Sequence, residues 1–382
     1  MLGALVAVVA WYSIMLIART VSRGDDFMVF YRVAQRFWDG VRPYDQVTFG
    51  NMVFKYPPWI LPFFLPFSLV DVVTAKVIWG VIEAASLIFI VRRAHQGFGG
   101  LPPVRPAVQV FLLLVLFGLF GSHGLTGQIT LPMLAVAIAI DPLRASFSRF
   151  TILVAALSAK ATSVFPLFHA LNRKRLAMSV FGTAAVFFVL SLPIYVKSYD
   201  RHYGAMRDEW VSAMFSGTQD VNSVRIGFTT REVQGLPSLL LRKAGFDEQK
   251  PSHVLFTTVF SFGFLAGAWA WLSRKRSATV RWVGWIALMP AVQPLAWFHV
   301  FLFAYPLLAF AGELAFLENR IDSRRERVVG LAVCALLIGA VGAKTMGELG
   351  NQLELASIKL WGLLGAVGIF LLVSWKKEVG SR

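Results

Sequence analysis

Long runs of apolar residues alternate with short polar connections along most of the chain. The runs lie at residues 2–18, 72–91, 106–121, 129–140, 150–171, 177–195, 253–272, 279–292, 297–312, 328–343 and 357–374. A helix needs about 20 residues to cross the hydrocarbon core of a bilayer, and several of these runs approach that length. The pattern therefore predicts an all-α polytopic membrane protein.

Two apolar segments need a separate interpretation. Residues 58–69 are too short and too rich in proline to span easily, so we expect them to lie along the membrane surface. The run 150–171 contains Lys160 at its middle, where a lone ammonium costs about 2.5–3.5 kcal/mol on insertion scales. We therefore divide this run into two short helices that meet at a water-exposed turn around Lys160, which gives about 12 transmembrane helices.

The distribution of Lys and Arg predicts the orientation, because these residues gather on the cytoplasmic side. The outer turns 122–128 and 293–296 contain neither residue, whereas every inner connection contains some. Both termini are then cytoplasmic, and two long outer loops span residues 19–71 and 196–252. We find no internal repeat and no linker, so residues 1–382 form a single membrane domain.

Composition excludes several classes of protein. Hydrophobic residues make up 57% of the chain and charged residues 15%, against about 25% charged in soluble domains. A net charge of +16 on so apolar a chain is not typical of a nucleic-acid-binding domain. Cys334 is the one cysteine of the sequence, so a disulfide within the chain is excluded and a cysteine-built metal site is disfavoured. The motifs of nucleotide-using soluble enzymes are also missing. We expect a substrate that is already in the membrane and no cofactor. The sequence contains no convincing set of metal ligands and leaves the metal requirement open.

Polar groups that lipid disfavours collect on the outer side of this topology. They are Asp25, Asp26, Gln128, Lys160 and His299. Together they predict a polar pocket at the outer interface, covered by loops that are longer than connections usually are unless they are functional.

Residues 27–38 of the first outer loop have the spacing of an amphipathic helix. Phe27, Phe30, Tyr31, Ala34 and Trp38 share one face, which is typical of a helix at the membrane interface. Asp26 immediately precedes this helix, so the residue pattern alone leaves two roles open for it, a helix cap or a functional carboxylate. Glu83, in the middle of a predicted span, is interpreted as an interhelical hydrogen bond or ion pair.

An ordered series of motifs resembles a known enzyme family. The series contains Gly24-Asp-Asp-Phe-Met-Val-Phe-Tyr, Gly40-Val-Arg-Pro-Tyr-Asp, Lys55-Tyr-Pro-Pro-Trp, Gly127-Gln, Ala159-Lys and Gln293-Pro-Leu-Ala-Trp-Phe-His. It is similar to glycosyltransferase family 87, bacterial mannosyltransferases of the type C membrane fold (GT-C) that use polyprenyl-phosphate-mannose. Two departures are an additional acid, Asp25, and Val300 after His299, where the family often has a second His or a Tyr.

The resemblance implies an inverting transfer of mannose from polyprenyl-phosphate-mannose to a glycolipid or glycan acceptor. Asp26 would be the general base, and the donor phosphate or the substrate would contact residues on the outer side. These contacts are His299, Lys160, Gln128, Asp25, Tyr56 and Arg225. The implied location is the bacterial inner membrane with the site facing outward. The expected partners are the donor, the acceptor and membrane lipids but no nucleic acid, and we expect a monomer.

Two other functions stay open at this point. A secondary transporter or lipid flippase would fit about 12 spans and the charges of Glu83 and Lys160, although transporters tend to contain paired repeats and midplane sites. A transferase of the same fold that uses another lipid-linked sugar, such as arabinose, would differ only in a few hydroxyl contacts.

Overall fold

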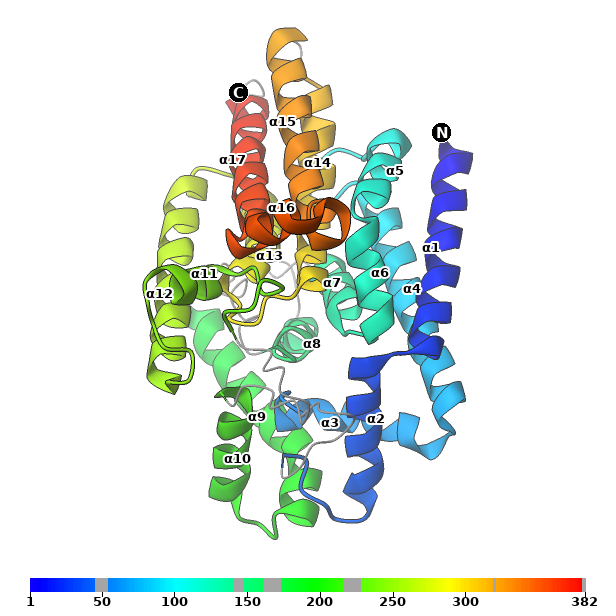
Figure 1. Ribbon diagram of the computed structural model, residues 1–382, viewed down its shortest axis with the longest axis vertical. Helices are drawn as coiled ribbons and strands as arrows, with labels where there is room; N and C mark the ends of the chain where they lie inside the picture. Colours follow the sequence, from blue (N-terminus) through cyan, green and yellow to red (C-terminus); the bar gives the residue numbers. More distant parts are fainter. Residues whose placement is uncertain (45–53, 141–146, 161–172, 216–227, 319–320, 380–382) are drawn as a thin grey trace.

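The computed structural model describes residues 1–44, 54–140, 147–160, 173–215, 228–318 and 321–379. The fold is all-helical, with 79% helix and no strand among these residues. Both termini lie at one end of the molecule, and α2, α3, α9 and α10 lie at the other (Figure 1). The predicted all-α class is therefore confirmed.

The helices follow the apolar runs, with several short additions. In chain order they are α1 (Leu2–Ser22), α2 (Asp25–Trp38), η1 (Pro58–Ile60), α3 (Leu61–Phe64), η2 (Leu65–Leu69), α4 (Val72–Gln96), α5 (Pro106–Val115), α6 (Phe117–Thr126), α7 (Thr130–Ala139), α8 (Phe147–Leu157), α9 (Arg173–Ser198), α10 (Tyr203–Phe215), α11 (Leu236–Lys243), α12 (Pro251–Ser273), α13 (Ala278–Val292), η4 (Phe298–Ala304), α14 (Tyr305–Phe316), α15 (Ile321–Gly339), α16 (Ala343–Leu355) and α17 (Ile358–Val379).

The number of membrane spans is smaller by a strict criterion than the sequence suggested. Among the described residues, α1, α4, α12 and the continuous segment η4–α14 are long and apolar enough to cross a bilayer. Two bent pairs, α5 with α6 and α15 with α16, raise this number to six. Several other apolar helices have only 10–17 residues, which is short for a span of about 20. Twelve spans therefore remain a prediction.

The centre of the molecule is the segment η4–α14. The most apolar 18-residue window of this segment is 94% buried, whereas the corresponding windows of α1 and α12 are 28% buried. Helices with so much exposed apolar surface are typical of a lipid-facing position. The segment that carries His299 is thus enclosed by protein rather than by lipid.

The structure describes most of the predicted first outer loop, in which the expected helix is present and Trp38 of its predicted apolar face is exposed. The amphipathic helix is α2, and its apolar residues Phe27, Phe30 and Tyr31 are buried. It begins at Asp25, so Asp26 lies within its first turn instead of before it. Residues 58–69 form the short segments η1, α3 and η2, which fits their interpretation as a non-spanning stretch.

The structure describes only the first part of the break predicted at Lys160. Helix α8 ends at Leu157 and Lys160 follows in a turn, as expected. The second short helix proposed for this run falls on residues 161–172, which lie outside the described residues.

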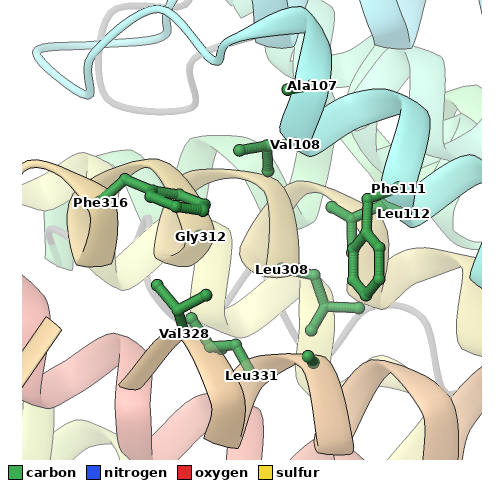
Figure 2. A pocket seen from close by; sticks show the side chains of 10 residues that line it. Ala107, Val108, Phe111, Leu112, Leu308, Gly312, Phe316, Val328 and Leu331 are labelled. Atoms are coloured by element: carbon green, nitrogen blue, oxygen red, sulfur yellow. The ribbon is translucent and has the colours of Figure 1, made fainter. Parts of the chain in front are cut away.

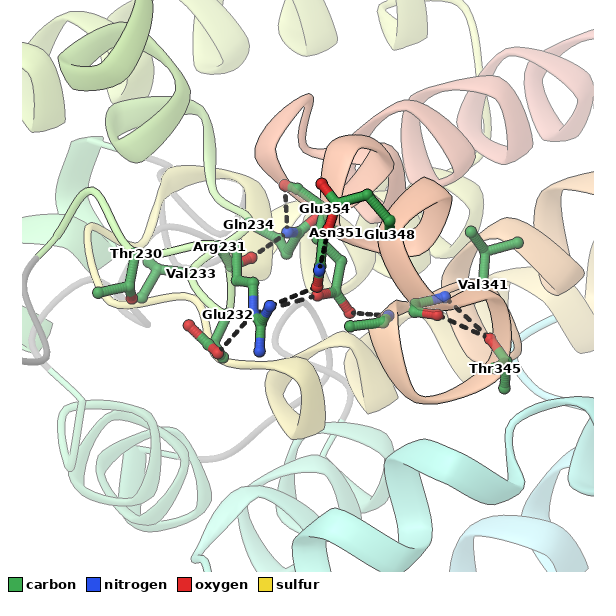
Figure 3. Close-up of polar contacts among 12 residues, drawn as sticks. Thr230, Arg231, Glu232, Val233, Gln234, Val341, Thr345, Glu348, Asn351 and Glu354 are labelled. Carbon is green, nitrogen blue, oxygen red and sulfur yellow. Dashed lines mark hydrogen bonds and ion pairs between the residues drawn. The ribbon is translucent and has the colours of Figure 1, made fainter.

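Helix α16 was not predicted. The run 328–343 was expected to be one span, but α15 ends at Gly339 and the chain bends by 97° into α16. A polar network holds α16 against the end of the second outer loop (Figure 3). In this network Gln234 Nε2 donates to the carbonyl of Glu354 at 2.6 Å, and Arg231 donates to Asn351.

Candidate active site

Two left-handed glycines bring the N-terminus of α2 against the turn between α6 and α7. Gly24 has a φ of 57° and precedes α2, while Gly127 has a φ of 66° and ends α6. A Cβ on Gly127 would lie 2.9 Å from Cβ of Phe27 and 3.4 Å from Cα of Gly24. Only glycine combines this conformation with such a close approach. The two turns therefore place Asp26, two residues after Gly24, next to Gln128, which directly follows Gly127.

Asp26, Gln128 and Tyr56 form a chain of hydrogen bonds. Gln128 Nε2 donates to Oδ2 of Asp26, and the Tyr56 hydroxyl donates to Oε1 of Gln128 at 3.2 Å. This fixes the orientation of the amide, because its oxygen is used by Tyr56. Among the described residues, Oδ1 of Asp26 has no hydrogen-bond donor. One carboxylate oxygen is therefore held while the other remains for a ligand.

The surroundings of Asp26 make it a stronger base than an ordinary aspartate. Its burial raises the pKa to about 6, an increase that the hydrogen bond from Gln128 and the charges of Lys160 and His123 reduce and that Asp25 adds to. Desolvation favours the neutral form of a carboxyl, and nearby cations favour the charged form. The carboxyl is still largely ionised at neutral pH, and its proton affinity is close to the optimum for general base catalysis.

Lys160 lies within electrostatic range of Asp26, and His299 lies within electrostatic range of Lys160. The ammonium of Lys160 has one long contact among the described residues, to Thr130 Oγ1 at 3.4 Å. Burial lowers the pKa of Lys160 to about 8, although Asp26 works against this change. His299 is only 4% exposed and lies within electrostatic range of Lys160. The cluster therefore combines one carboxylate with donors that can face an anion.

The remaining candidates are placed differently. Asp25 points to Arg23, with which it forms an ion pair, and not into the cluster. The possible role of Asp26 as a helix cap is wrong: Gly24 is the N-cap residue, and no side chain caps the helix. Arg225 lies outside the described residues. No group of three or more His, Cys, Asp or Glu side chains that could hold a metal occurs in the described part of the chain.

Sequence reasoning missed His123. It lies on the last turn of α6, is fully buried, and its Nε2 is 2.9 Å from Oε1 of Glu83 on α4. Glu83 Oε2 accepts a hydrogen bond from Thr20 on α1 at 2.6 Å, so the interhelical contact expected for Glu83 is present. The apolar runs gave no signal for this pair, because Glu83 lies in the run 72–91 whereas His123 falls in the predicted outer turn 122–128.

An apolar cavity lies elsewhere in the molecule. It has a volume of about 280 Å³ and is formed by α5, α14 and α15 (Figure 2). Its walls include Phe111, Leu308, Phe316 and Leu331, and none of the candidate site residues lines it. The polar cluster, and not this cavity, has the chemistry of an active site.

Comparison with known proteins identifies a family. The model of glycosyltransferase family 87 matches residues 54–294, which is more than half of the chain. The matched range contains Tyr56, Gln128 and Lys160, begins after Asp26 and ends before His299. Searches of the curated proteins and of the solved structures give no match.

Proposed function

Because the chain belongs to glycosyltransferase family 87, we propose that it is an inverting transferase that moves mannose from polyprenyl-phosphate-mannose to a glycolipid or glycan acceptor. The observation that carries this proposal is the Asp26 carboxylate, which is held by Gln128 through one oxygen and lies in a cluster with Lys160. The family makes a transporter or flippase the weaker alternative.

The proposed reaction is a single displacement. Oδ1 of Asp26 takes the proton of the acceptor hydroxyl, whose oxygen attacks the anomeric carbon as the bond to the phosphate oxygen breaks. One base suffices, because the polyprenyl phosphate leaves as an anion and does not need an acid of the kind that a glycosidase uses. The orientation that Gln128 imposes on the carboxylate reduces the number of unproductive geometries.

Cationic and hydrogen-bonding groups would stabilise the leaving phosphate. Lys160 supplies a positive charge from the turn after α8, and His299 supplies a ring nitrogen from the buried segment η4. Fixed donors in a site that excludes water stabilise developing charge more strongly than water does. Tyr56 supports this arrangement from the other side, because burial and the nearby Asp26 raise the pKa of its hydroxyl and keep it a donor.

Substitution of the two neighbouring acids tests the assignment. Asp26→Asn should reduce transfer from labelled polyprenyl-phosphate-mannose by at least about 100-fold, the usual contribution of a general base. Asp25→Asn is the matched control, because Asp25 pairs with Arg23 and should keep most of the activity. Activity is measured in membranes that contain equal amounts of each variant.

Other results would revise or overturn the proposal. An inactive Asp25→Asn with an active Asp26→Asn would move the base by one residue, and full activity in both would reject this mechanism. Transfer from polyprenyl-phosphate-arabinose but not from the mannose donor would change the sugar. Movement of lipid or sugar across vesicles without a new glycosidic bond would favour a transporter.

A further inference from the structure

Three helices bury a polar cluster that the proposed reaction does not use. Thr20 on α1, Glu83 on α4 and His123 on α6 are each 0% exposed. Thr20 Oγ1 donates to Oε2 of Glu83, and also contacts the carbonyl of Gly124 at 3.1 Å. His123 Nε2 approaches Oε1 of Glu83 at 2.9 Å.

The cluster is more than is needed to hold the helices together. The hydrogen bond from Thr20 already joins α1 to α4, and small-residue packing is an available alternative in membranes. Removal of two ionisable side chains from water is costly even when they are paired. Moreover, both ring nitrogens of His123 and Oε1 of Glu83 are buried without a hydrogen-bond partner of good geometry among the described residues, and unsatisfied buried polar atoms add to that cost.

The position of His123 connects the cluster to the candidate active site. Its carbonyl accepts the hydrogen bond from the amide of Gly127 at 2.9 Å, so it belongs to the turn that presents Gln128. Its ring meets the ring of His299 edge-on, with the two centroids 6.3 Å apart. His123 therefore has Glu83 on one side and the residues of the site on the other.

We propose that Glu83 and His123 form a positioning pair that holds the turn carrying Gln128 against Asp26 and holds the ring of His299 in place, an inference that rests on the proposed function. Glu83 fixes one edge of the ring, because its Oε1 lies 2.9 Å from Nε2. The carbonyl of His123 holds the turn of Gly127 and Gln128, and the edge of its ring supports the ring of His299. Neither residue of the pair touches the substrate.

The charged groups around Asp26 determine whether its pKa should rise or fall in each variant. Asp25 on the same helix and Tyr56 from the same predicted outer loop are acidic groups, whereas Lys160 and His123 are basic groups. Displacement of Gln128 in a pair variant should raise the pKa of Asp26 above about 6, because the hydrogen bond from Gln128 lowers this pKa. Loss of the Glu83 charge by itself would act in the opposite direction. A higher pKa of Asp26 in the Glu83→Gln variant would therefore show that Glu83 acts through His123.

Reaction of the full-length protein with dicyclohexylcarbodiimide tests the pair without measuring transfer. The reagent labels protonated carboxyl groups, so the pH of half-maximal labelling of Asp26, read by mass spectrometry, reports its proton affinity. The pair predicts a midpoint near 6 for the wild type and higher midpoints for His123→Gln and Glu83→Gln. The double variant should resemble the single ones, as expected for residues that act as a unit.

Tyr12→Phe is the matched control. It removes another buried interhelical hydrogen bond, from Tyr12 Oη to the carbonyl of Leu113 at 2.6 Å, on the same helix as Thr20. It should lower thermal stability and leave the midpoint unchanged. Unchanged midpoints in both pair variants, with lower stability alone, would show that the pair is only structural and would overturn the inference.

Transfer assays separate this inference from the proposed function. The pair variants should lose about 10–100-fold in kcat, the usual effect of a partner that orients a functional group, with little change in the KM of the donor. Normal kcat in these variants beside an inactive Asp26→Asn would overturn the inference alone. An active Asp26→Asn would overturn the proposed function instead, and the labelling midpoints would still test the pair.

Discussion

Asp26 and Lys160 should define the two limbs of the pH profile. The reaction needs Asp26 ionised, so kcat/KM should rise as the pH increases through about 6. It also needs Lys160 charged, so kcat/KM should fall as the pH increases through about 8. This ratio reports the free enzyme, in which these pKa values apply.

Two variants of Lys160 distinguish its contribution from that of Asp26. Lys160→Arg cannot lose its charge in this range, so the alkaline limb should disappear while the acidic limb remains. Lys160→Gln should move the acidic limb upward, because Lys160 lowers the pKa of Asp26. An alkaline limb that persists in Lys160→Arg would assign it to another group. Initial rates from pH 5 to pH 9 measure both limbs.

Gly127 forms the turn that places Gln128 next to Asp26, so the geometry of the site depends on this glycine. Gly127→Ala requires an unfavourable φ of 66° and brings the new Cβ to 2.9 Å from that of Phe27. We expect a loss of about 1–3 kcal/mol in stability and a lower kcat, because Gln128 is displaced from Asp26. Gly245→Ala has a similar φ of 72° with nothing within 4 Å of the new Cβ. This control should be less destabilised and fully active, and equal kcat values in the two variants would contradict the role of the turn.

At the scale of elements, the polar network around α16 should stabilise the segment that carries His299. Gln234 connects this segment to α16. Its backbone N–H donates to the carbonyl of Ala296 at 3.0 Å, and its side-chain Nε2 donates to the carbonyl of Glu354 (Figure 3). Lys359 of the neighbouring helix α17 also contacts this segment, with its ammonium 4.8 Å from the ring centroid of Phe298. The element that the sequence did not predict therefore supports a predicted site residue from outside.

Gln234→Leu tests this support. The substitution leaves buried carbonyls without a donor, which costs about 1–3 kcal/mol, and should lower the melting temperature in detergent together with kcat. Gln352→Leu is the matched control, since Gln352 is exposed and bonds only Glu348 within α16. If Gln234→Leu lowered the melting temperature without changing kcat, α16 would have no influence on the site.

The elements differ in how well the sequence predicted them. Helix α2 was predicted because its apolar residues repeat with helical spacing. Helix α16 was missed because its sequence is polar and contains Gly347 with a φ of 56°, which is typical of a loop. The 62° bend between α5 and α6 occurs at Leu116 without a proline, so no local signal marks it. In the site, Asp26, Gln128 and Lys160 were predicted from polar residues in apolar surroundings, whereas their mutual contacts depend on packing of distant segments.

At the scale of the whole molecule, the two ends of α12 offer a test of orientation. Gln249 precedes this helix and Lys275 follows it, and both are exposed. The end of α12 lies at the same end of the molecule as both termini (Figure 1). The surplus of Lys and Arg predicts that this end faces the cytoplasm. The start of α12 and the second outer loop would then face outward.

Labelling of single-cysteine variants tests the predicted orientation. Cys334 is buried and the sequence has no other cysteine, so a Cys334→Ala background suits the insertion of Gln249→Cys or Lys275→Cys. An impermeant maleimide should label Gln249→Cys in intact cells and Lys275→Cys only after the membrane is opened, because α12 is long enough to separate the two positions. The reverse pattern would place Asp26 on the cytoplasmic side, where an acceptor on the outer surface is out of reach. Labelling of both positions in intact cells would show that α12 does not cross the membrane.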